Sequence, residues 1–347
     1  MSSKAVIAID AMGGDHGPES VIPGLAIVQK EHPNVSYLIY GDEGKVAPLL
    51  NQNEKLKAVS AIIHTDKAIS SSEKPSAALR ASKGSSMRMA IEAVKDGRAH
   101  AVVSAGNTGA LMALSKMILK PLSGIHRPAI ASVFPAQKGQ TIMLDLGANV
   151  LVDGANLVQF AVLGAAFAKV HMGKDVPSVG LLNVGSEEVK GPDHVRAAAR
   201  TMKEIEFPGQ YYGFVEGDDI TKGTVDVVVS DGYAGNVALK AAEGVGKLSN
   251  LMFRKHLKSD PLSILGACLS YFALKRFKNE LDPRRYNGGV FLGLNGLCVK
   301  SHGGCDALAF SSAVNLAAEL AEQGYIETVA RDINSLMEQE SFMSQNI

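Results

Sequence analysis

Short β-rich runs alternate with longer helical stretches along most of this chain, and this alternation limits its fold more than any other feature. Strands separated by helices pair most readily as a parallel sheet with the helices packed on its faces. Helical spacing of apolar residues covers 84–96 and 305–323, and 155–170 is apolar enough for a buried helix. The sequence therefore predicts an α/β fold with a mainly parallel sheet. The expected strands are 5–10, 36–40, 59–64, 101–104, 129–133, 141–145, 178–183 and 225–230.

The length and composition fit one large α/β domain or two smaller ones, in a reducing compartment. The 347 residues are 46% hydrophobic, which is enough for a sizeable core, and no clean domain boundary interrupts them. The 35 basic and 35 acidic residues cancel, so no global charge favours a nucleic-acid partner. Cys268, Cys298 and Cys305 form no CxxC pair. We expect a single catalytic unit over 1–347, cytoplasmic, without a signal peptide or a membrane span, and with a flexible tail at 338–347.

An apolar run near the start of the chain, Ile7–Asp10, ends at a carboxylate and turns through glycines into a helix. The paired Gly13 and Gly14 permit positive φ and let the backbone approach a ligand closely, and Pro18 suits the first turn of the helix that follows. Unpaired N–H groups at such a turn are suited to an anion. The sequence therefore predicts a phosphate-binding turn here.

Five further turns place small polar residues directly after expected strands or apolar segments. Ligands of open α/β sheets bind at the carboxyl ends of the strands, so these turns are the expected site. One such turn alone is explained as well by the ordinary preference of Asn, Asp and Gly for turns. Five of them on one expected sheet edge favour a site. The turns are Ser104–Ala110, Asp145–Asn149, Asn183–Glu187, Ser230–Asn236 and Lys300–Gly304.

Taken together, these segments resemble one enzyme family over nearly the whole chain, the PlsX-type phosphate acyltransferases. The resemblance implies transfer of a fatty acyl group from acyl carrier protein to inorganic phosphate, giving acyl phosphate for phospholipid synthesis. It also implies a three-layer α/β/α fold similar to the isocitrate and isopropylmalate dehydrogenases and to phosphotransacetylase, a homodimer, and peripheral attachment to the membrane. The strings that carry it are, in order, IDAMGGDHGP, SAGNTGALM, GIHRPA, LDLGAN, GLLNVGSEE followed by KG, VVVSDGYAGNVALK, YNGG and KSHG.

This chain lacks the signature motifs of several other enzyme classes. No GxGxxG follows a strand, and Gly246 and Lys247 are followed by Leu248, so neither a nicotinamide fingerprint nor a Walker A sequence is complete. No GxSxG elbow and no evident Cys–His pair supplies a nucleophile. Phosphate is itself largely anionic near neutral pH, since the second pKa of a phosphoester is about 6. We therefore expect direct attack of phosphate on the thioester, without an acyl-enzyme, a cofactor or a metal.

The turns supply the candidate site residues. Asp10, Asp15 and His16 would orient the first turn or carry a proton, although Asp15 and His16 serve equally well as a helix cap and a turn histidine. The candidates in the later turns also suit turns or caps. The catalytic candidates are Asp10, Asp15, His16, Asn107 and His302, and the candidates for contact with phosphate or substrate are Gly13, Gly14, Ser104, Gly106, Thr108, Asn183, Glu187, Asp231 and Asn236.

The stretch 246–286 departs from the α/β alternation and is predicted to form a helical hairpin. Residues 247–258 fit one helix, Pro261 breaks it, and 262–281 fit a second helix whose first half is apolar almost all round. An apolar tip beside basic residues suits an anionic membrane surface, although a dimer interface or a core helix explains the pattern too. The residues expected at the membrane are Leu262, Leu265, Leu269, Phe272, Lys275 and Arg276.

A basic face also suits the acidic acyl carrier protein. Lys190, Arg196 and Arg200, which follow the Asn183–Glu187 turn, are the candidates for docking it. Two other functions stay open. A phosphotransacetylase-like enzyme that uses coenzyme A would need no docking patch, and a non-catalytic sensor of acyl groups or phosphate would bind without turnover.

Overall fold

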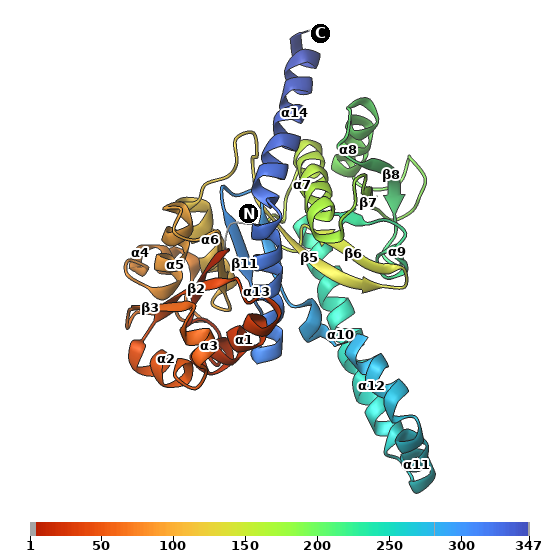
Figure 1. Ribbon diagram of the computed structural model, residues 1–347. Helices are drawn as coiled ribbons and strands as arrows, with labels where there is room; N and C mark the ends of the chain where they lie inside the picture. The colour runs from red at the N-terminus through yellow and green to blue at the C-terminus, as the bar shows by residue number, and fades with distance from the viewer. Residues whose placement is uncertain (1–4, 281, 346–347) are drawn as a thin grey trace.

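One mixed sheet of eleven strands forms the middle layer of the computed structural model, which describes residues 5–280 and 282–345 (Figure 1). Helices cover both faces of this sheet, so the predicted three-layer α/β/α fold is confirmed. In the order in which they pair, the strands are β3 (Ser60–His64), β2 (Ser36–Gly41), β1 (Val6–Asp10), β4 (Ala101–Ser104), β11 (Leu297–Lys300), β10 (Gly289–Leu292), β5 (Ala129–Ala136), β6 (Gly139–Leu144), β9 (Val227–Val229), β7 (Ser178–Leu182) and β8 (Gln210–Val215).

The helices divide between the two faces of the sheet. One face packs against α1 (Pro18–Glu31), α2 (Glu43–Leu50), α3 (Glu54–Lys57), α7 (Gly154–Met172), α8 (Asp193–Glu204), α13 (Ala307–Glu322) and α14 (Tyr325–Gln345). The other face packs against α4 (Pro75–Ala81), α5 (Ser86–Lys95), α6 (Thr108–Ile118), α9 (Asp219–Lys222) and the start of α10 (Gly232–Leu257). The remaining elements are α11 (Pro261–Leu269), α12 (Tyr271–Glu280) and the short 3₁₀ helix η1 (Pro283–Tyr286).

The hydrophobic clusters on the two faces of the sheet follow from the alternation of side chains along each strand. Ile7 and Ile9 of β1 join the larger core, which includes α1 and α13, whereas Ala8 between them joins the cluster under α5 and α6. In β6, Ile142 and its neighbour two residues on face the α7 side, and Met143 faces the other side. Strands buried on both faces need apolar residues at every position, which is why these segments are almost continuously hydrophobic.

Helix α7 is the core helix that the apolar stretch 155–170 predicted. By length and composition alone it could cross a membrane, but 78% of its most apolar window is buried inside the protein. It packs against α8, α14 and β9. No other helix in the described residues passes the same test of length and hydropathy.

The strands run in two opposed sets, because β5 and β10 interrupt the parallel pairing. β10 is antiparallel to both β11 and β5, and β6 is antiparallel to β5. Consequently β1, β2, β3, β4 and β11 run one way, and β6, β7, β8 and β9 run the other. The sheet is thus mainly parallel within each half, as predicted, but the two halves are antiparallel to each other.

All eight predicted strands are present, with ends within three residues of those expected. The predicted helices at 84–96, 155–170 and 305–323 are also confirmed, as α5, α7 and α13. Three strands were not predicted, namely β8, β10 and β11. β10 and β11 lie at the centre of the sheet, so their absence from the prediction hid the reversal of direction described above.

A long helical arm projects from the body and contains the predicted hairpin (Figure 1). α10 runs out along it, and α11 and α12 return. The rings of Phe253 of α10 and Phe277 of α12 pack in a tilted arrangement with a centroid distance of 5.6 Å. The outgoing helix begins at Gly232 and not at 247, because the Asp231 side chain caps it there. The prediction of a single helix over 262–281 is wrong, because α11 ends at Ser270. Residue 281 lies outside the described residues.

The last part of the chain is helical where a flexible tail was expected. α14 continues to Gln345 and stands out from the body in Figure 1. Residues 346 and 347 of the expected tail lie outside the described residues.

Candidate functional site

A buried carboxylate fixes the turn that follows β1. Asp10 is 1% exposed, and its two oxygens accept hydrogen bonds from Ser86 Oγ (2.7 Å) and Ser104 Oγ (2.6 Å). Ser104 Oγ in turn accepts a hydrogen bond from the Gly106 N–H (3.0 Å). Burial raises the pKa of the Asp10 carboxyl, and the hydrogen bonds from the two serines oppose that rise. Through these hydrogen bonds, the buried Asp10 side chain positions the turns after β1 and β4.

Gly13 and Gly14 lie where a larger residue does not fit. A Cβ at Gly13 would lie 2.6 Å from the Gly106 nitrogen and 2.7 Å from Asp10 Oδ2. Gly14 has a φ of +86°, and a Cβ there would lie 2.8 Å from the Gly303 oxygen. The two glycines thus let the turn after β1 pack directly against the turns after β4 and β11.

A pocket of about 290 Å³ opens where these three turns meet. α6 begins there at Thr108, and the Asn107 side chain caps it by accepting a hydrogen bond from the Ala110 N–H (3.0 Å). The Asn107 amide also donates to the Ser71 oxygen (2.9 Å) and the Glu73 oxygen (2.8 Å). Since the first N–H groups of a helix lack partners within the helix, the start of α6 favours an anion. The pocket is lined by Gly14, Ser71, Ala105, Gly106, Asn107, Thr108, Gly109, Lys300 and Gly303.

The pocket also contains a cation that the sequence analysis did not select. Lys300 ends β11, and its Nζ donates hydrogen bonds to the Ala105 oxygen (3.0 Å) and to the Ser301 oxygen. Burial lowers the pKa of the Lys300 ammonium to about 8, while Cys305 and Asp10 act in the opposite direction. The signal that could have identified it is a lysine at the end of an apolar run, immediately before a glycine-rich turn.

Three predicted catalytic residues, Asp15, His16 and His302, are exposed on the turns after β1 and β11. The Asp15 N–H donates to the Gly303 oxygen (2.8 Å), and His302 Nδ1 accepts a hydrogen bond from the Gly304 N–H (3.2 Å). Their side chains are accessible to a substrate, and their catalytic roles stay predictions. Within the described residues, no three His, Cys, Asp or Glu side chains form a cluster that could hold a metal ion.

A second buried carboxylate, which the predicted site residues did not include, organises the turn after β6. Asp145 Oδ1 accepts hydrogen bonds from the N–H groups of Ile130 (2.9 Å), Ala148 (3.1 Å) and Gly147 (3.3 Å). Its Oδ2 accepts from the N–H (2.6 Å) and Nδ2 (3.0 Å) of Asn149. Burial raises the pKa of the Asp145 carboxyl, and these hydrogen bonds oppose the rise. Because its oxygens are fully engaged, Asp145 shapes the turn.

The turn after β9 packs against the turn after β6. Asp231 caps α10 by accepting a hydrogen bond from the Ala234 N–H (2.8 Å), and its other oxygen lies 3.5 Å from His194 Nε2. Asn236 Nδ2 donates to the Leu146 oxygen (3.2 Å). Both predicted residues therefore have structural partners, and Asp231 connects this turn to α8.

The turn after β7 carries the predicted docking residues on an exposed loop and helix. Asn183 Nδ2 donates to the Lys190 carbonyl oxygen (3.1 Å) and so closes the loop. The Lys190 ammonium pairs with Glu187 (2.8 Å), and Arg196 pairs with an aspartate three residues earlier on α8. Arg200 is exposed on the same helix. Exposed pairs of this kind are weak, so these cations can exchange partners with an acidic surface.

The structure divides the predicted turns into two groups, which corrects the expectation of one shared sheet edge. The turns after β1, β4 and β11 line the 290 Å³ pocket. The turns after β6 and β9 contact each other, and α8, which follows the turn after β7, reaches the turn after β9 through His194 and Asp231. In a flat sheet the two groups would lie at opposite edges, because their strands run in opposite directions. The usual twist of about 20–25° per strand amounts to roughly 100–125° over the five steps from β4 to β9, and such a twist reduces the angle between the two groups.

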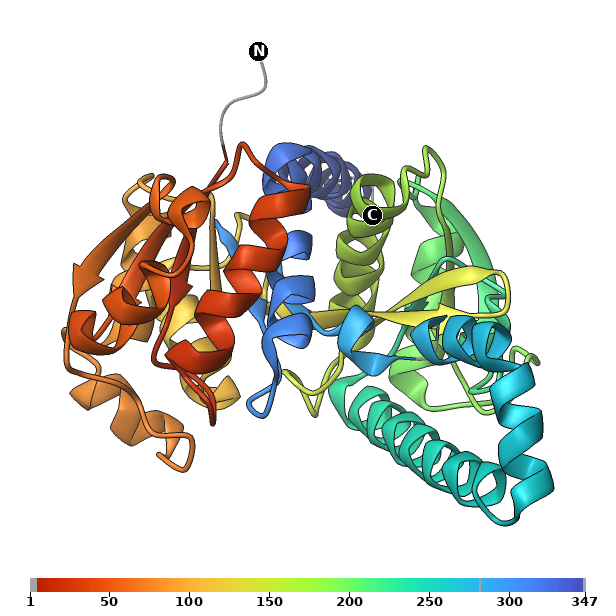
Figure 2. The same ribbon diagram turned by 60° about the horizontal axis from the view of Figure 1, so that its bottom comes forward.

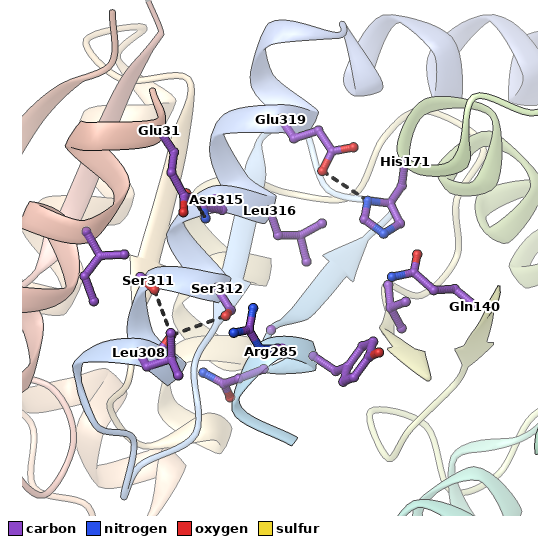
Figure 3. Close-up of a pocket in the computed structure, with 15 residues that line it drawn as sticks. Glu31, Gln140, His171, Arg285, Leu308, Ser311, Ser312, Asn315, Leu316 and Glu319 are labelled. Atoms are coloured by element: carbon purple, nitrogen blue, oxygen red, sulfur yellow. Dashed lines mark hydrogen bonds and ion pairs between the residues drawn. The ribbon is translucent and has the colours of Figure 1, made fainter. Parts of the chain in front are cut away.

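A second pocket, of about 270 Å³, lies between α1, α13 and η1 (Figure 3). Its two carboxylates are engaged, since Glu31 accepts a hydrogen bond from Asn315 Nδ2 (2.8 Å) and Glu319 lies 3.2 Å from His171 Nδ1. Arg285 also lines it and is drawn among the other lining residues in Figure 3. None of the predicted site residues lines this pocket. The first pocket, which unites predicted residues with a helix start and a cation, is the better candidate for the active site.

The fold defines the class as an α/β/α protein of the architecture found in a phosphotransacetylase and in a protein described as a dehydrogenase, with a candidate anion site at the strand ends. The EutD phosphotransacetylase of Staphylococcus aureus matches with a TM-score of 0.63 at 18% identity, over 92% of this chain and 95% of that one. A putative 4-hydroxythreonine-4-phosphate dehydrogenase from Salmonella typhimurium matches with a TM-score of 0.53 at 14% identity, over 92% and 99%. These likenesses establish the fold alone.

The sequence comparisons establish the family. The model of the family described as fatty acid synthesis protein matches residues 5–328, and the chain belongs to this family. A relative named phosphate acyltransferase, from Parvibaculum lavamentivorans, is 52% identical over 337 residues, covering 97% of this chain and 93% of its own. The resemblance proposed from the sequence motifs is confirmed.

Proposed function

We propose that this chain is an acyltransferase that moves a fatty acyl group from acyl carrier protein to inorganic phosphate, giving acyl phosphate for phospholipid synthesis. The observation that carries the proposal is the 290 Å³ pocket, where the start of α6, Gly14 and Lys300 converge. A helix start and a lysine are the usual partners of a phosphate group in proteins. The phosphate acyltransferase relatives at about 50% identity over nearly the full chain support the reaction class.

The pocket suits a mechanism that depends on positioning and charge. Phosphate held there attacks the thioester carbonyl with one oxygen, the carbon–sulfur bond breaks, and the phosphate proton passes to the departing thiolate. The exposed Asp15, His16 and His302 are our candidates for carrying that proton, and Thr108 for stabilising the oxyanion. Holding the two reactants close together in the correct orientation accounts for a large part of the rate in reactions of this kind, and no acyl-enzyme is required.

We assign the docking of acyl carrier protein to the exposed cations that follow β7. Lys190, Arg196 and Arg200 belong to the second group of turns, and our proposal has these turns face the same side of the molecule as the pocket, a placement that the twist of a long sheet favours. A carrier held there would present its thioester to the space between the two groups of turns. Asn183, Glu187, Asp231 and Asn236 would then contact the carrier or its prosthetic arm.

The function is tested with purified protein, acyl carrier protein carrying a long acyl chain, and phosphate, with acyl phosphate detected by mass spectrometry. We expect product only when phosphate is present. The Lys190→Glu/Arg196→Glu variant should raise the KM for acyl carrier protein several-fold and leave the KM for phosphate unchanged. A variant with unaltered KM, together with equal turnover of acyl coenzyme A, would favour a phosphotransacetylase-like enzyme. Binding without turnover would favour a sensor.

We further propose that the protein is a cytoplasmic homodimer that attaches peripherally to the membrane through its helical arm. The arm carries apolar side chains that the rest of the chain leaves exposed. The exposed fractions of Leu262, Leu269 and Phe272 are 77%, 81% and 74%. Lys275 and Arg276 adjoin this apolar tip, which suits an anionic lipid surface. Leu248 and Met252, one turn apart on α10, are exposed by 54% and 52% and offer an apolar surface that suits a second copy. A mass of one chain in sedimentation equilibrium would contradict the dimer.

Replacing the apolar tip with carboxylates tests the membrane contact. We expect the Leu269→Asp/Phe272→Asp variant to lose at least tenfold in binding to anionic vesicles, because each buried apolar side chain contributes about 1.5–3 kcal/mol. Val176→Asp, at a residue 66% exposed on the body, is the matched control and should bind as the wild type does. Sedimentation with vesicles measures both. Equal binding by the two variants would assign the tip to another partner.

A further inference from the structure

The ammonium group of Lys300 lines the first pocket, and one of its N–H donors has no partner among the described residues. A lysine ammonium carries three N–H donors. Two of them go to the main-chain oxygens of Ala105 and Ser301. No other hydrogen bond or ion pair of this group occurs within the described part of the chain, and Lys300 lines the pocket. The third donor is therefore available to a ligand in the pocket.

We propose that Lys300 is a catalytic residue that binds the attacking phosphate directly, donating its third N–H to a phosphate oxygen opposite the start of α6. This inference rests on the proposed function and names the group that holds its nucleophile. Asp10, an acidic group that faces Lys300, accepts hydrogen bonds from Ser86 and Ser104 and none from Lys300, so it does not occupy the third Lys300 donor. A point charge in a partly buried site attracts a phosphate far more strongly than one in water does.

The surroundings of Lys300 make the phosphate affinity dependent on pH. The titratable groups that face it are Asp10 at the end of β1, Asp15 on the following turn, Cys298 on its own strand and Cys305 before α13. Burial lowers the pKa of Lys300 to about 8, so the free enzyme loses this positive charge as the pH rises through that value. Phosphate binding favours the charged form. We expect the KM for phosphate to rise above about pH 8, by up to tenfold per pH unit.

Two substitutions and one control test the assignment. Lys300→Met should raise the KM for phosphate by about 10- to 150-fold, the range set by losing one hydrogen bond to a charged group, with the KM for the acyl donor within twofold of wild type. Lys300→Arg keeps the charge and should move the alkaline rise in KM above pH 10. Lys116→Met, at an exposed lysine of α6, should leave both constants unchanged. A wild-type phosphate KM and pH profile in Lys300→Met would overturn the proposal.

A binding measurement separates this proposal from folding defects and from the proposed function. Phosphate should raise the melting temperature of the wild type and of Lys116→Met, but not that of a Lys300→Met protein that still melts cooperatively. If Lys300→Met does not fold, the pH dependence of the phosphate KM tests the proposal instead. The KM should rise at alkaline pH in the wild type, and the rise should move to higher pH in Lys300→Arg. A wild-type KM that does not rise between pH 7 and 9.5 overturns the proposal. If the wild type binds phosphate through Lys300 yet forms no acyl phosphate, the proposed function and the catalytic role of Lys300 fail, and only its assignment as a phosphate-binding residue stands.

Discussion

Gly14→Val should lose at least about 100-fold in kcat/KM for phosphate while the protein stays folded. A Cβ at Gly14 would lie 2.8 Å from the Gly303 oxygen and 3.0 Å from Ala105 Cβ, and both residues line the pocket. The turns after β1, β4 and β11 would have to separate to admit the side chain. Because misplacement of a reacting group by about 1 Å can cost 100-fold in rate, this separation should abolish most turnover. Steady-state kinetics with varied phosphate measures the loss.

The matched control for this substitution is Gly173→Val. Gly173 also has positive φ, at +63°, but a Cβ there would meet nothing within 4 Å. The control therefore carries a similar backbone strain without a steric clash at the pocket. We expect it to lower the stability by about 1 kcal/mol and to leave the kinetics unchanged. Wild-type kinetics in Gly14→Val would exclude this pocket as the site of phosphate binding.

The second large effect is expected for stability, at Asp145. Asp145→Ala removes the acceptor for four main-chain N–H groups and for the Asn149 amide. Each buried donor left without a partner costs about 1–3 kcal/mol. Water can reach some of these groups, so we expect a total loss of about 3 kcal/mol in the free energy of unfolding. Urea denaturation followed by circular dichroism measures it.

Asp175→Ala provides the control, because Asp175 is exposed on the loop after α7. Its substitution should change the free energy of unfolding by no more than about 0.5 kcal/mol, as is usual for surface positions. If Asp145→Ala unfolds at the same urea concentration as this control, the turn after β6 does not depend on the buried carboxylate.

The sequence predicted the layers of this fold well, because alternating apolar runs and helical spacing record which residues are buried. It did not predict β8, β10 and β11. The β8 segment carries Gly213 at a φ of +116° and lies at the edge of the sheet, where a strand needs fewer apolar residues. β10 and β11 are four residues long and separated by a turn with two glycines, so their pattern resembles a loop. Strand direction, in turn, is set by tertiary pairing and not by local sequence.

The candidate site was predicted in part for the same reasons. Gly14, Gly106 and Thr108 stand in turns whose composition points to close approach of the backbone, and the structure places all three at one pocket. Lys300 was not selected, because lysine is usually exposed and its sequence neighbours do not reveal that its side chain folds back into the protein. The grouping of the turns depends on the reversal between the half-sheets, which the sequence pattern does not record.

A crystal structure with phosphate bound tests the central claim most directly. We predict phosphate in the pocket of about 290 Å³, with its oxygens within hydrogen-bonding distance of Lys300 Nζ and of the main-chain N–H groups at the start of α6. Figure 2 shows the fold from a second direction, with the helical arm projecting from the body. Phosphate bound instead among the turns after β6 and β9, or beside Arg285 in the second pocket, would contradict the account.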